Sequence, residues 1–133
     1  MEFNTQVCTT MEQSKRLLVL GLKKETADMK LVPYTSEAIS IDYNDGNFLE
    51  DDLYPAWSLH RLMAMLPDKI KMMSIAMEWW DFHLQIYKTT ISYIGLRGVT
   101  AFNQNDNLYD NIIDCIEWLI KDGHFNKKHL KEK

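Results

Sequence analysis

The chain lacks long hydrophobic runs and an export signal, and we therefore expect neither a membrane-spanning nor a secreted protein. Its fully apolar stretches are a few residues long, whereas a membrane helix needs about 20. Residues 1–6 contain neither a basic region nor an apolar region, so they do not resemble a signal peptide. We therefore expect a soluble, cytoplasmic protein with no membrane partner.

Cysteine and paired histidine are also scarce, which argues against metal, redox and nucleophilic chemistry. Cys8 and Cys115 lie far apart and match no metal-binding or redox spacing. Cys115 falls on the apolar side of a predicted helix, which favours a buried thiol over a disulfide or a nucleophile. No two of the four histidines stand at the spacing of paired metal ligands. We predict no catalytic residue, no metal and no cofactor, and therefore no enzyme. A small enzyme with an unrecognised site is kept as the second alternative function.

An excess of basic residues is missing as well. The net charge is −4, whereas a nucleic-acid-binding protein normally presents a basic face. A local patch could still form around the carboxy-terminal tail. Nucleic-acid binding is therefore the alternative function, and its candidate contacts are Arg97, Lys127, Lys128, Lys131 and Lys133.

What remains is the composition of an ordinary globular protein. Hydrophobic residues make up 46% of the 133 residues and charged residues 26%, which are values typical of soluble domains. No linker, repeat or low-complexity segment divides the chain. We predict a single domain over residues 1–133, with an ordered core of about 9–125 and a frayed basic tail at 127–133.

The segment 55–67 is the clearest structural signal, and it predicts a short helix between two prolines. Ser58 is suited to cap the helix, and Trp57 and Leu62 occupy the two positions of a hydrophobic staple. Pro67 ends the helix, because a proline disfavours the α conformation of the residue before it. The predicted apolar face consists of Leu59, Leu62, Met63 and Leu66.

Two further helices are predicted from their end signals. The segment 10–20 begins with a capping box, either Thr9 with Glu12 or Thr10 with Gln13, and ends at Gly21 in a Schellman closure. The segment 107–122 is capped by Asn105 or Asn107 and ends at Gly123. Its apolar stripe is Leu108, Ile112, Cys115, Ile116 and Leu119, broadened by Ile113 and Ile120.

The remaining segments alternate between apolar and polar residues, which is typical of strands. Residues 39–43 and 48–49 predict a hairpin around the turn 44–47, and 31–34 an edge strand because of Pro33. Residues 72–77 fit either a helix or a strand. The alternation over 82–87 and the short connections to 91–93 and 99–102 favour a strand meander. The predicted fold class is α+β, with a small antiparallel sheet packed against two or three helices.

The order of several short motifs resembles a known family. These motifs are residues 9–18, Gly21-Leu22, residues 26–29, residues 55–59 and residues 118–120. The pattern, which covers about 9–125, is similar to small uncharacterised proteins from phages, prophages and mobile elements of gut anaerobic bacteria. The segments near Phe48 and at 72–77 depart from it. The resemblance implies a phage or mobile-element origin, and it transfers no activity and no site residue.

The aromatic residues suggest what the protein does. Trp79 and Trp80 are adjacent, so in a strand they point to opposite faces of the sheet. An exposed Trp beside Met77 and Phe82 suits a protein-binding surface, because aromatics and Met are enriched at interfaces. The leading hypothesis is a non-catalytic protein-interaction module whose candidate surface is Trp79, Trp80, Met77 and Phe82. A homodimer could form there or through an apolar sheet edge.

Overall fold

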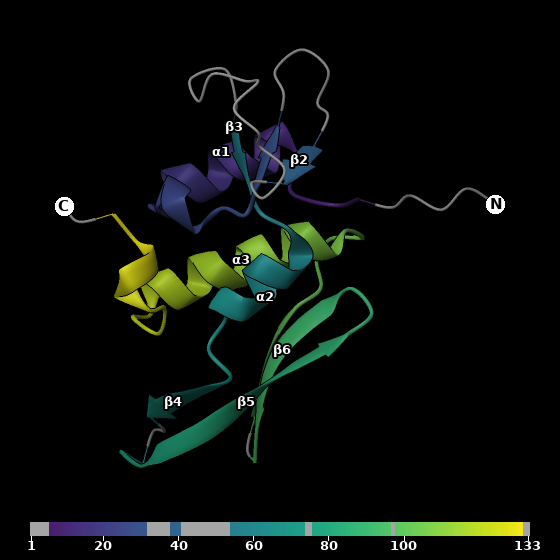
Figure 1. The fold of residues 1–133 in the computed structure, drawn as a ribbon. Coiled ribbons are helices and arrows are strands. Elements are labelled where there is room, and N and C mark those ends of the chain that lie inside the picture. Colours follow the sequence, from purple (N-terminus) through teal and green to yellow (C-terminus); the bar gives the residue numbers. More distant parts are fainter. Residues whose placement is uncertain (1–5, 32–37, 41–53, 74–75, 97, 132–133) are drawn as a thin grey trace. The chain divides into compact units, whose positions relative to one another are not determined.

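Two compact units make up the protein, and the second is inserted into the sequence of the first. The computed structural model describes residues 6–31, 38–40, 54–73, 76–96 and 98–131. Residues 1–65 and 127–133 form unit 1, and residues 66–126 form unit 2. The described residues contain three α-helices and two antiparallel sheets (Figure 1), so the predicted α+β class is confirmed. That the two units behave as one domain stays a prediction.

Helix α1 (Met11–Val19) of unit 1 is closed at both ends as the sequence predicts. Thr10 and Gln13 form the capping box, each side chain bonding the other's backbone N–H. Gly21 adopts φ of 106° at the other end. The N–H groups of Gly21 and Leu22 donate to the carbonyls of Leu18 and Leu17 at 3.0 and 3.2 Å, which is the hydrogen-bond pattern of a Schellman closure.

Helix α2 (Leu59–Met65) occupies only part of the predicted 55–67 helix. Ser58 caps it, accepting a hydrogen bond from the Arg61 N–H at 3.1 Å. The preceding residues form strand β3 (Tyr54–Ala56) instead. Trp57 and Leu62 are fully buried, as the predicted staple requires. Met63 is exposed and Met65 is buried, so the predicted apolar face was wrong at Met63.

A three-stranded antiparallel sheet with the order β2-β1-β3 completes the amino-terminal part of unit 1. Its strands are β1 (Met29–Leu31), β2 (Ala38–Ser40) and β3, and a 3₁₀ turn η1 (Lys24–Thr26) precedes it. Figure 1 shows α1 lying alongside this sheet. Strand β1 is central in this sheet, and Leu31, its last residue, is the one part of the predicted 31–34 edge strand that lies within the described residues. Pro33, the turn 44–47 and the return strand at 48–49 lie outside the described residues.

The basic tail is ordered over residues 127–131, contrary to the predicted fraying. A 3₁₀ turn, η4 (Lys127–His129), precedes an isolated antiparallel bridge between Leu130 and Leu22. The Lys23 N–H donates to the His129 carbonyl at 2.9 Å, and the Lys131 N–H donates to the Gly21 carbonyl at 2.7 Å. These bonds satisfy backbone groups just beyond α1, which is why the tail is held there.

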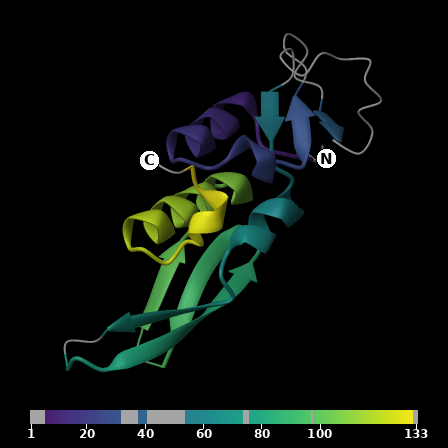
Figure 2. The ribbon, with the colours of Figure 1, turned by 60° about the vertical axis from the view of Figure 1, so that its left-hand side comes forward.

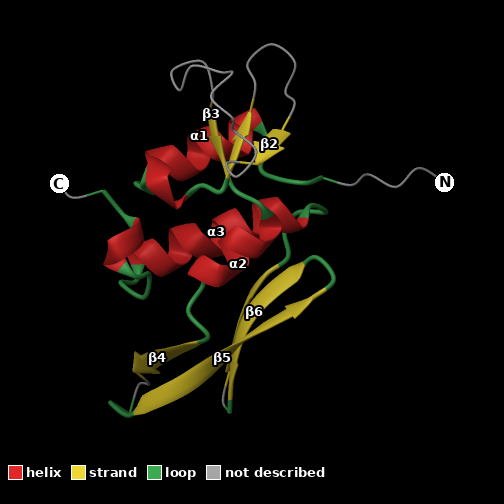
Figure 3. Ribbon diagram, in the orientation of Figure 1, coloured by secondary structure: helices red, strands yellow, loops and turns green. Residues whose placement is uncertain are grey.

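Unit 2 contains the predicted meander, an antiparallel sheet with the order β4-β5-β6-β7 (Figure 3). Its strands are β4 (Lys69–Met73), β5 (Trp79–Tyr87), β6 (Thr90–Gly95) and β7 (Gly98–Phe102). The strand interpretation of the ambiguous 72–77 segment is therefore right up to Met73. Met77 instead lies in the connection from β4 to β5 and has φ of 62°.

One face of this sheet, the inner face, packs against helix α3 (Leu108–Lys121), as Figure 2 shows. Trp118 of α3 contacts Tyr93 of β6 and Phe102 of β7, with ring centroids 6.3 and 5.7 Å apart. The Tyr93 hydroxyl donates to the Pro67 carbonyl at 2.7 Å. The predicted stripe of α3 is confirmed at its centre, where the fully buried residues are Ile112, Ile113, Cys115, Ile116 and Leu119.

Both ends of α3 also agree with the sequence. Asn107 caps it, accepting from the Asp110 N–H at 3.2 Å, whereas Asn105 bonds the side chain of Asn111. Gly123 ends it with φ of 77°. Glu117 and Lys121, one helical turn apart, form an ion pair at 3.2 Å. The helix is thus positioned by local signals at its ends and by its apolar stripe.

Candidate functional site

The outer face of the four-stranded sheet, opposite α3, exposes an unusual amount of apolar surface. Strand register places Met73 opposite Trp79 and Ile94 opposite Val99, and each such pair shares one face of the sheet. Met73, Trp79 and Val99 are 49%, 63% and 59% exposed. Single exposed apolar residues are common, whereas several on one sheet face indicate an interaction surface.

The apolar side chains gather at the end of the β4–β5 hairpin. We call Met73, Met77 and Trp79 the hairpin patch. Met77 is 77% exposed and adopts the left-handed conformation, which costs a residue with a side chain roughly 1–2 kcal/mol. The positive φ fits the place of Met77 in the connection between β4 and β5, because Lys88 in the β5–β6 turn also has a positive φ of 53°. The exposure of the Met77 side chain, rather than its backbone, is therefore what suggests a role in binding.

Charged groups lie beside the patch on the same face, along β4 and β5. Lys71 lies opposite Asp81, and Lys69 lies opposite His83. The Lys69 ammonium is 4.0 Å from the Asp81 carboxylate, a solvent-exposed pair that contributes little to stability. Protein-binding surfaces commonly combine apolar residues with charged residues at their edge.

Only part of the predicted interaction surface is exposed. Trp79 and Met77 are exposed as expected, and adjacent residues do face opposite sides of the strand. Trp80 is half-buried and Phe82 is only 8% exposed on the inner face, so both belong to packing. Met73 was missed, because the register that pairs it with Trp79 depends on where the hairpin turns.

No protein-family profile, curated protein or solved structure matches the chain. Within the described residues, no helix is long and apolar enough to cross a membrane. The same part of the chain contains no group of three or more His, Cys, Asp and Glu side chains placed to hold a metal ion. The case for a function therefore rests on the surfaces themselves.

A second surface, on unit 1, is basic. The ordered tail brings Lys128 and His129 close to Lys23 and Arg61. Burial is the main cause that lowers the pKa of His129, and the positive charges of Lys128, Arg61 and Lys23 lower it further. A histidine with a lowered pKa is neutral at physiological pH. Lys128, a tail residue predicted to contact nucleic acid, thus lies near Lys23 and Arg61, and the sequence did not predict this proximity.

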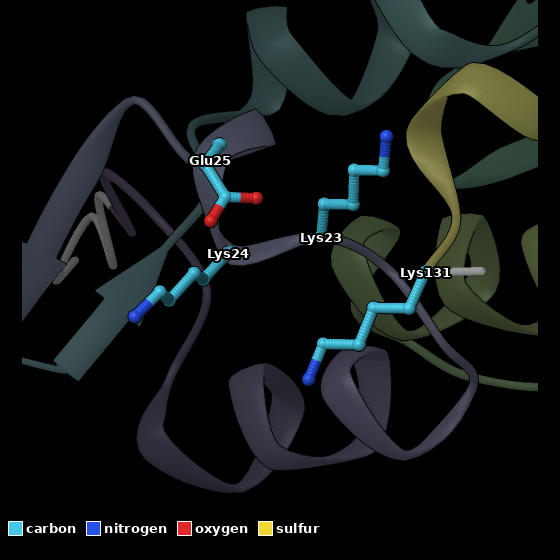
Figure 4. A pocket seen from close by; sticks show the side chains of 4 residues that line it. All are labelled: Lys23, Lys24, Glu25 and Lys131. Carbon is cyan, nitrogen blue, oxygen red and sulfur yellow. The ribbon is translucent and has the colours of Figure 1, made fainter. Parts of the chain in front are cut away.

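A shallow pocket of about 540 Å³ lies beside this surface. It is lined by Lys23, Lys24, Glu25 and Lys131, whose side chains are drawn in Figure 4. The side chains of Lys23 and Lys131 point in opposite directions. We call Lys23, Lys24, Arg61, Lys128 and Lys131 the basic cluster. Of the predicted contacts, Lys127 is exposed near it, and Arg97 and Lys133 lie outside the described residues.

The two thiols are placed for packing. Both are free and buried. Burial raises the pKa of Cys8 to about 11 and that of Cys115 to about 12, with Asp28 and Asp114 as the second causes. Because the thiolate is the nucleophile, thiols with such pKa values are unreactive near neutral pH.

Proposed function

We propose that the protein is a non-catalytic interaction module that binds a partner protein through the outer face of its four-stranded sheet. The observation that carries the proposal is the hairpin patch, where Trp79 and Met77 are 63% and 77% exposed. Trp is the residue most enriched among those that dominate binding energy. The resemblance noted above supports a phage or mobile-element origin, in which case the partner would be a phage or host protein.

The experiment compares three immobilised forms of the protein: wild type, Trp79→Ser and Val19→Ser. Val19 is the matched control, because it is an apolar residue of α1 that is 87% exposed on unit 1. We expect a partner to be retained by wild type and Val19→Ser and lost with Trp79→Ser. With the purified partner, Trp79→Ser should raise Kd at least about 10-fold. Equal retention of every protein by all three forms would contradict the proposal.

Met77→Gly provides a test in which weaker binding could not be caused by loss of the fold. Glycine adopts φ of 62° without strain, so the variant should be more stable by up to about 1 kcal/mol. It should nevertheless bind the partner more weakly, because it removes an exposed apolar side chain. Gain of stability with undiminished affinity would show that Met77 lies outside the binding surface.

The second candidate function is nucleic-acid binding by the basic cluster, favoured by the ordered tail that assembles it. DNA binding measured by fluorescence anisotropy should weaken as salt rises, with a slope of roughly 0.9 per phosphate neutralised. The double change Lys23→Glu and Arg61→Glu should reduce that slope, whereas Lys15→Glu on the exposed side of α1 should not. Absence of binding at low salt would exclude this function.

A further inference from the structure

The two edges of the four-stranded sheet differ in how they are protected. Edge strand β4 carries Lys69 and Lys71, and lysines on an edge strand oppose pairing with another strand. Edge strand β7 (Gly98–Phe102) has the sequence Gly-Val-Thr-Ala-Phe, with neither charge nor proline. Val99 and Ala101 are exposed on it. The β7 edge therefore lacks the features that prevent an edge strand from pairing with another chain.

The register shows which backbone groups of β7 face outward. In an antiparallel pair, hydrogen-bonded and non-hydrogen-bonded residue pairs alternate. Gly95 and Gly98 close the two-residue turn and Tyr93 pairs with Thr100, so the alternation directs Thr100 toward β6. The N–H and C=O groups of Val99 and Ala101 then point away from the sheet.

We propose that a second copy of this chain pairs with β7, antiparallel, about a twofold axis at Thr100. This register overlaps all five residues of both strands. Val99 of one copy faces Ala101 of the other, and each of the two such pairs exchanges two backbone hydrogen bonds. Phe102 faces Gly98, a contact in which an aromatic ring covers a glycine on an edge strand. Each of these pairs joins a large residue to a small one, which favours a second copy over an unrelated strand.

The resulting dimer is a continuous sheet with the outer faces of both copies on the same side. It presents two hairpin patches to one partner surface, yet it does not depend on the proposed function, because β7 and the hairpin patch are different surfaces. Since five residues form a short edge, we expect a concentration-dependent dimer rather than a permanent one.

The test is the mass in solution, measured by sedimentation from micromolar to millimolar protein. Wild type should approach twice the monomer mass as concentration rises. Ala101→Pro removes an outward N–H while sparing the ladder to β6, so it should stay monomeric. Lys71→Pro makes the matching change on the β4 edge and should dimerise as wild type does. A monomeric wild type, or an equal effect of both prolines, would overturn the proposal.

Disulfide trapping tests the register independently of any folding defect in Ala101→Pro. Residues directly opposite in a non-hydrogen-bonded pair have Cα atoms about 4.5 Å apart, which is within reach of a disulfide. Thr100→Cys should therefore cross-link to its counterpart on mild oxidation. Val99→Cys should not, because the two copies of residue 99 are offset along the strands. Equal trapping of both variants, or of neither, would contradict the register.

Discussion

Trp57 connects three segments of unit 1 through hydrogen bonds as well as packing. Its indole N–H donates to the Thr26 hydroxyl at 2.9 Å. Its backbone N–H donates to the Thr9 hydroxyl at 3.0 Å, and its carbonyl accepts from the Thr9 N–H at 2.9 Å. The side chain is fully buried. This residue fixes where the strand β3 ends and where the chain enters α2.

We therefore expect Trp57→Ala to lower the free energy of unfolding by about 3–5 kcal/mol. Trp57→Phe should cost less, because a six-membered aromatic ring stays buried, although the pyrrole ring and its hydrogen bond to Thr26 are lost. Trp79→Ala is the matched control: the same side chain, 63% exposed, should change stability by less than about 0.5 kcal/mol. Urea denaturation measures all three. Similar values for Trp57→Ala and Trp79→Ala would contradict the assigned roles.

The Cys115 thiol makes the free energy of unfolding depend on pH in the alkaline range. Burial raises its pKa from 9.0 to about 12 in the folded protein. Above pH 9 the thiol ionises in the unfolded chain but not in the folded one, which favours unfolding. The contribution of the Cys115 thiol to the free energy of unfolding is therefore complete below about pH 9 and is lost by about pH 12. From pH 8 to pH 10, wild type should lose about 1 kcal/mol more stability than Cys115→Ala. Equal losses would mean that this thiol ionises normally in the fold.

At the scale of single residues, the sequence predicts burial well where packing is local. Trp57, Cys115 and Leu62 were expected inside and are inside. Met63 was placed wrongly, because the same helical spacing permits a face centred on Met65 and only the neighbouring elements decide between them. Met73 and Phe82 needed the strand register, which a pattern of alternation does not supply.

At the scale of elements, Asn111 holds the start of α3 to the β5–β6 turn. Its side-chain amide is fully buried and donates to the carbonyls of Thr89 and Asn105 at 2.6 and 2.9 Å. Its oxygen accepts from the Asn105 backbone N–H and side chain at 3.0 and 3.1 Å. All hydrogen-bonding positions of the amide are used, which makes this residue a specific clamp.

Asn111→Asp should destabilise unit 2 by about 2–4 kcal/mol, because a carboxylate cannot donate and would be buried facing two carbonyls. Asn103→Asp, on the exposed loop before α3, introduces the same charge and should cost less than about 0.5 kcal/mol. Urea denaturation measures the free energy of unfolding of both variants. A small effect at Asn111 would show that the turn is held by the strands alone.

The most predictable elements were the helices whose ends carry capping residues or a closing glycine. The capping box of α1, the Schellman closures at Gly21 and Gly123 and the Asn107 cap are all set by neighbouring residues. Strand β3 was missed because Pro55 was interpreted only as the boundary of the segment that holds the Ser58-capped helix. Proline is tolerated there because β3 is an edge strand among the described strands. The clamp at Asn111 was missed for a different reason, since its partners are distant in sequence.

At the scale of the molecule, the chain leaves unit 1 after residue 65 and returns to it at 127. The return is made by Leu130, which bridges Leu22, and by the hydrogen bonds of Lys23 and Lys131. Composition alone suggested a solvated tail, because the segment is rich in lysine. Its ordering depends on backbone groups beyond α1 that need partners, and no local pattern in the tail shows that need.

Deleting residues 127–133 should therefore destabilise unit 1, whereas a frayed tail could be removed without effect. The deletion removes the bonds at 2.9 and 2.7 Å and exposes Leu22, for a cost of about 1–3 kcal/mol. Deleting only 132–133 leaves these contacts intact and is the control. Hydrogen exchange at the Lys23 amide should quicken in the longer deletion alone, since that N–H loses its acceptor. Unchanged exchange would mean that unit 1 closes without the tail, and the basic cluster would then depend on a segment free to leave it.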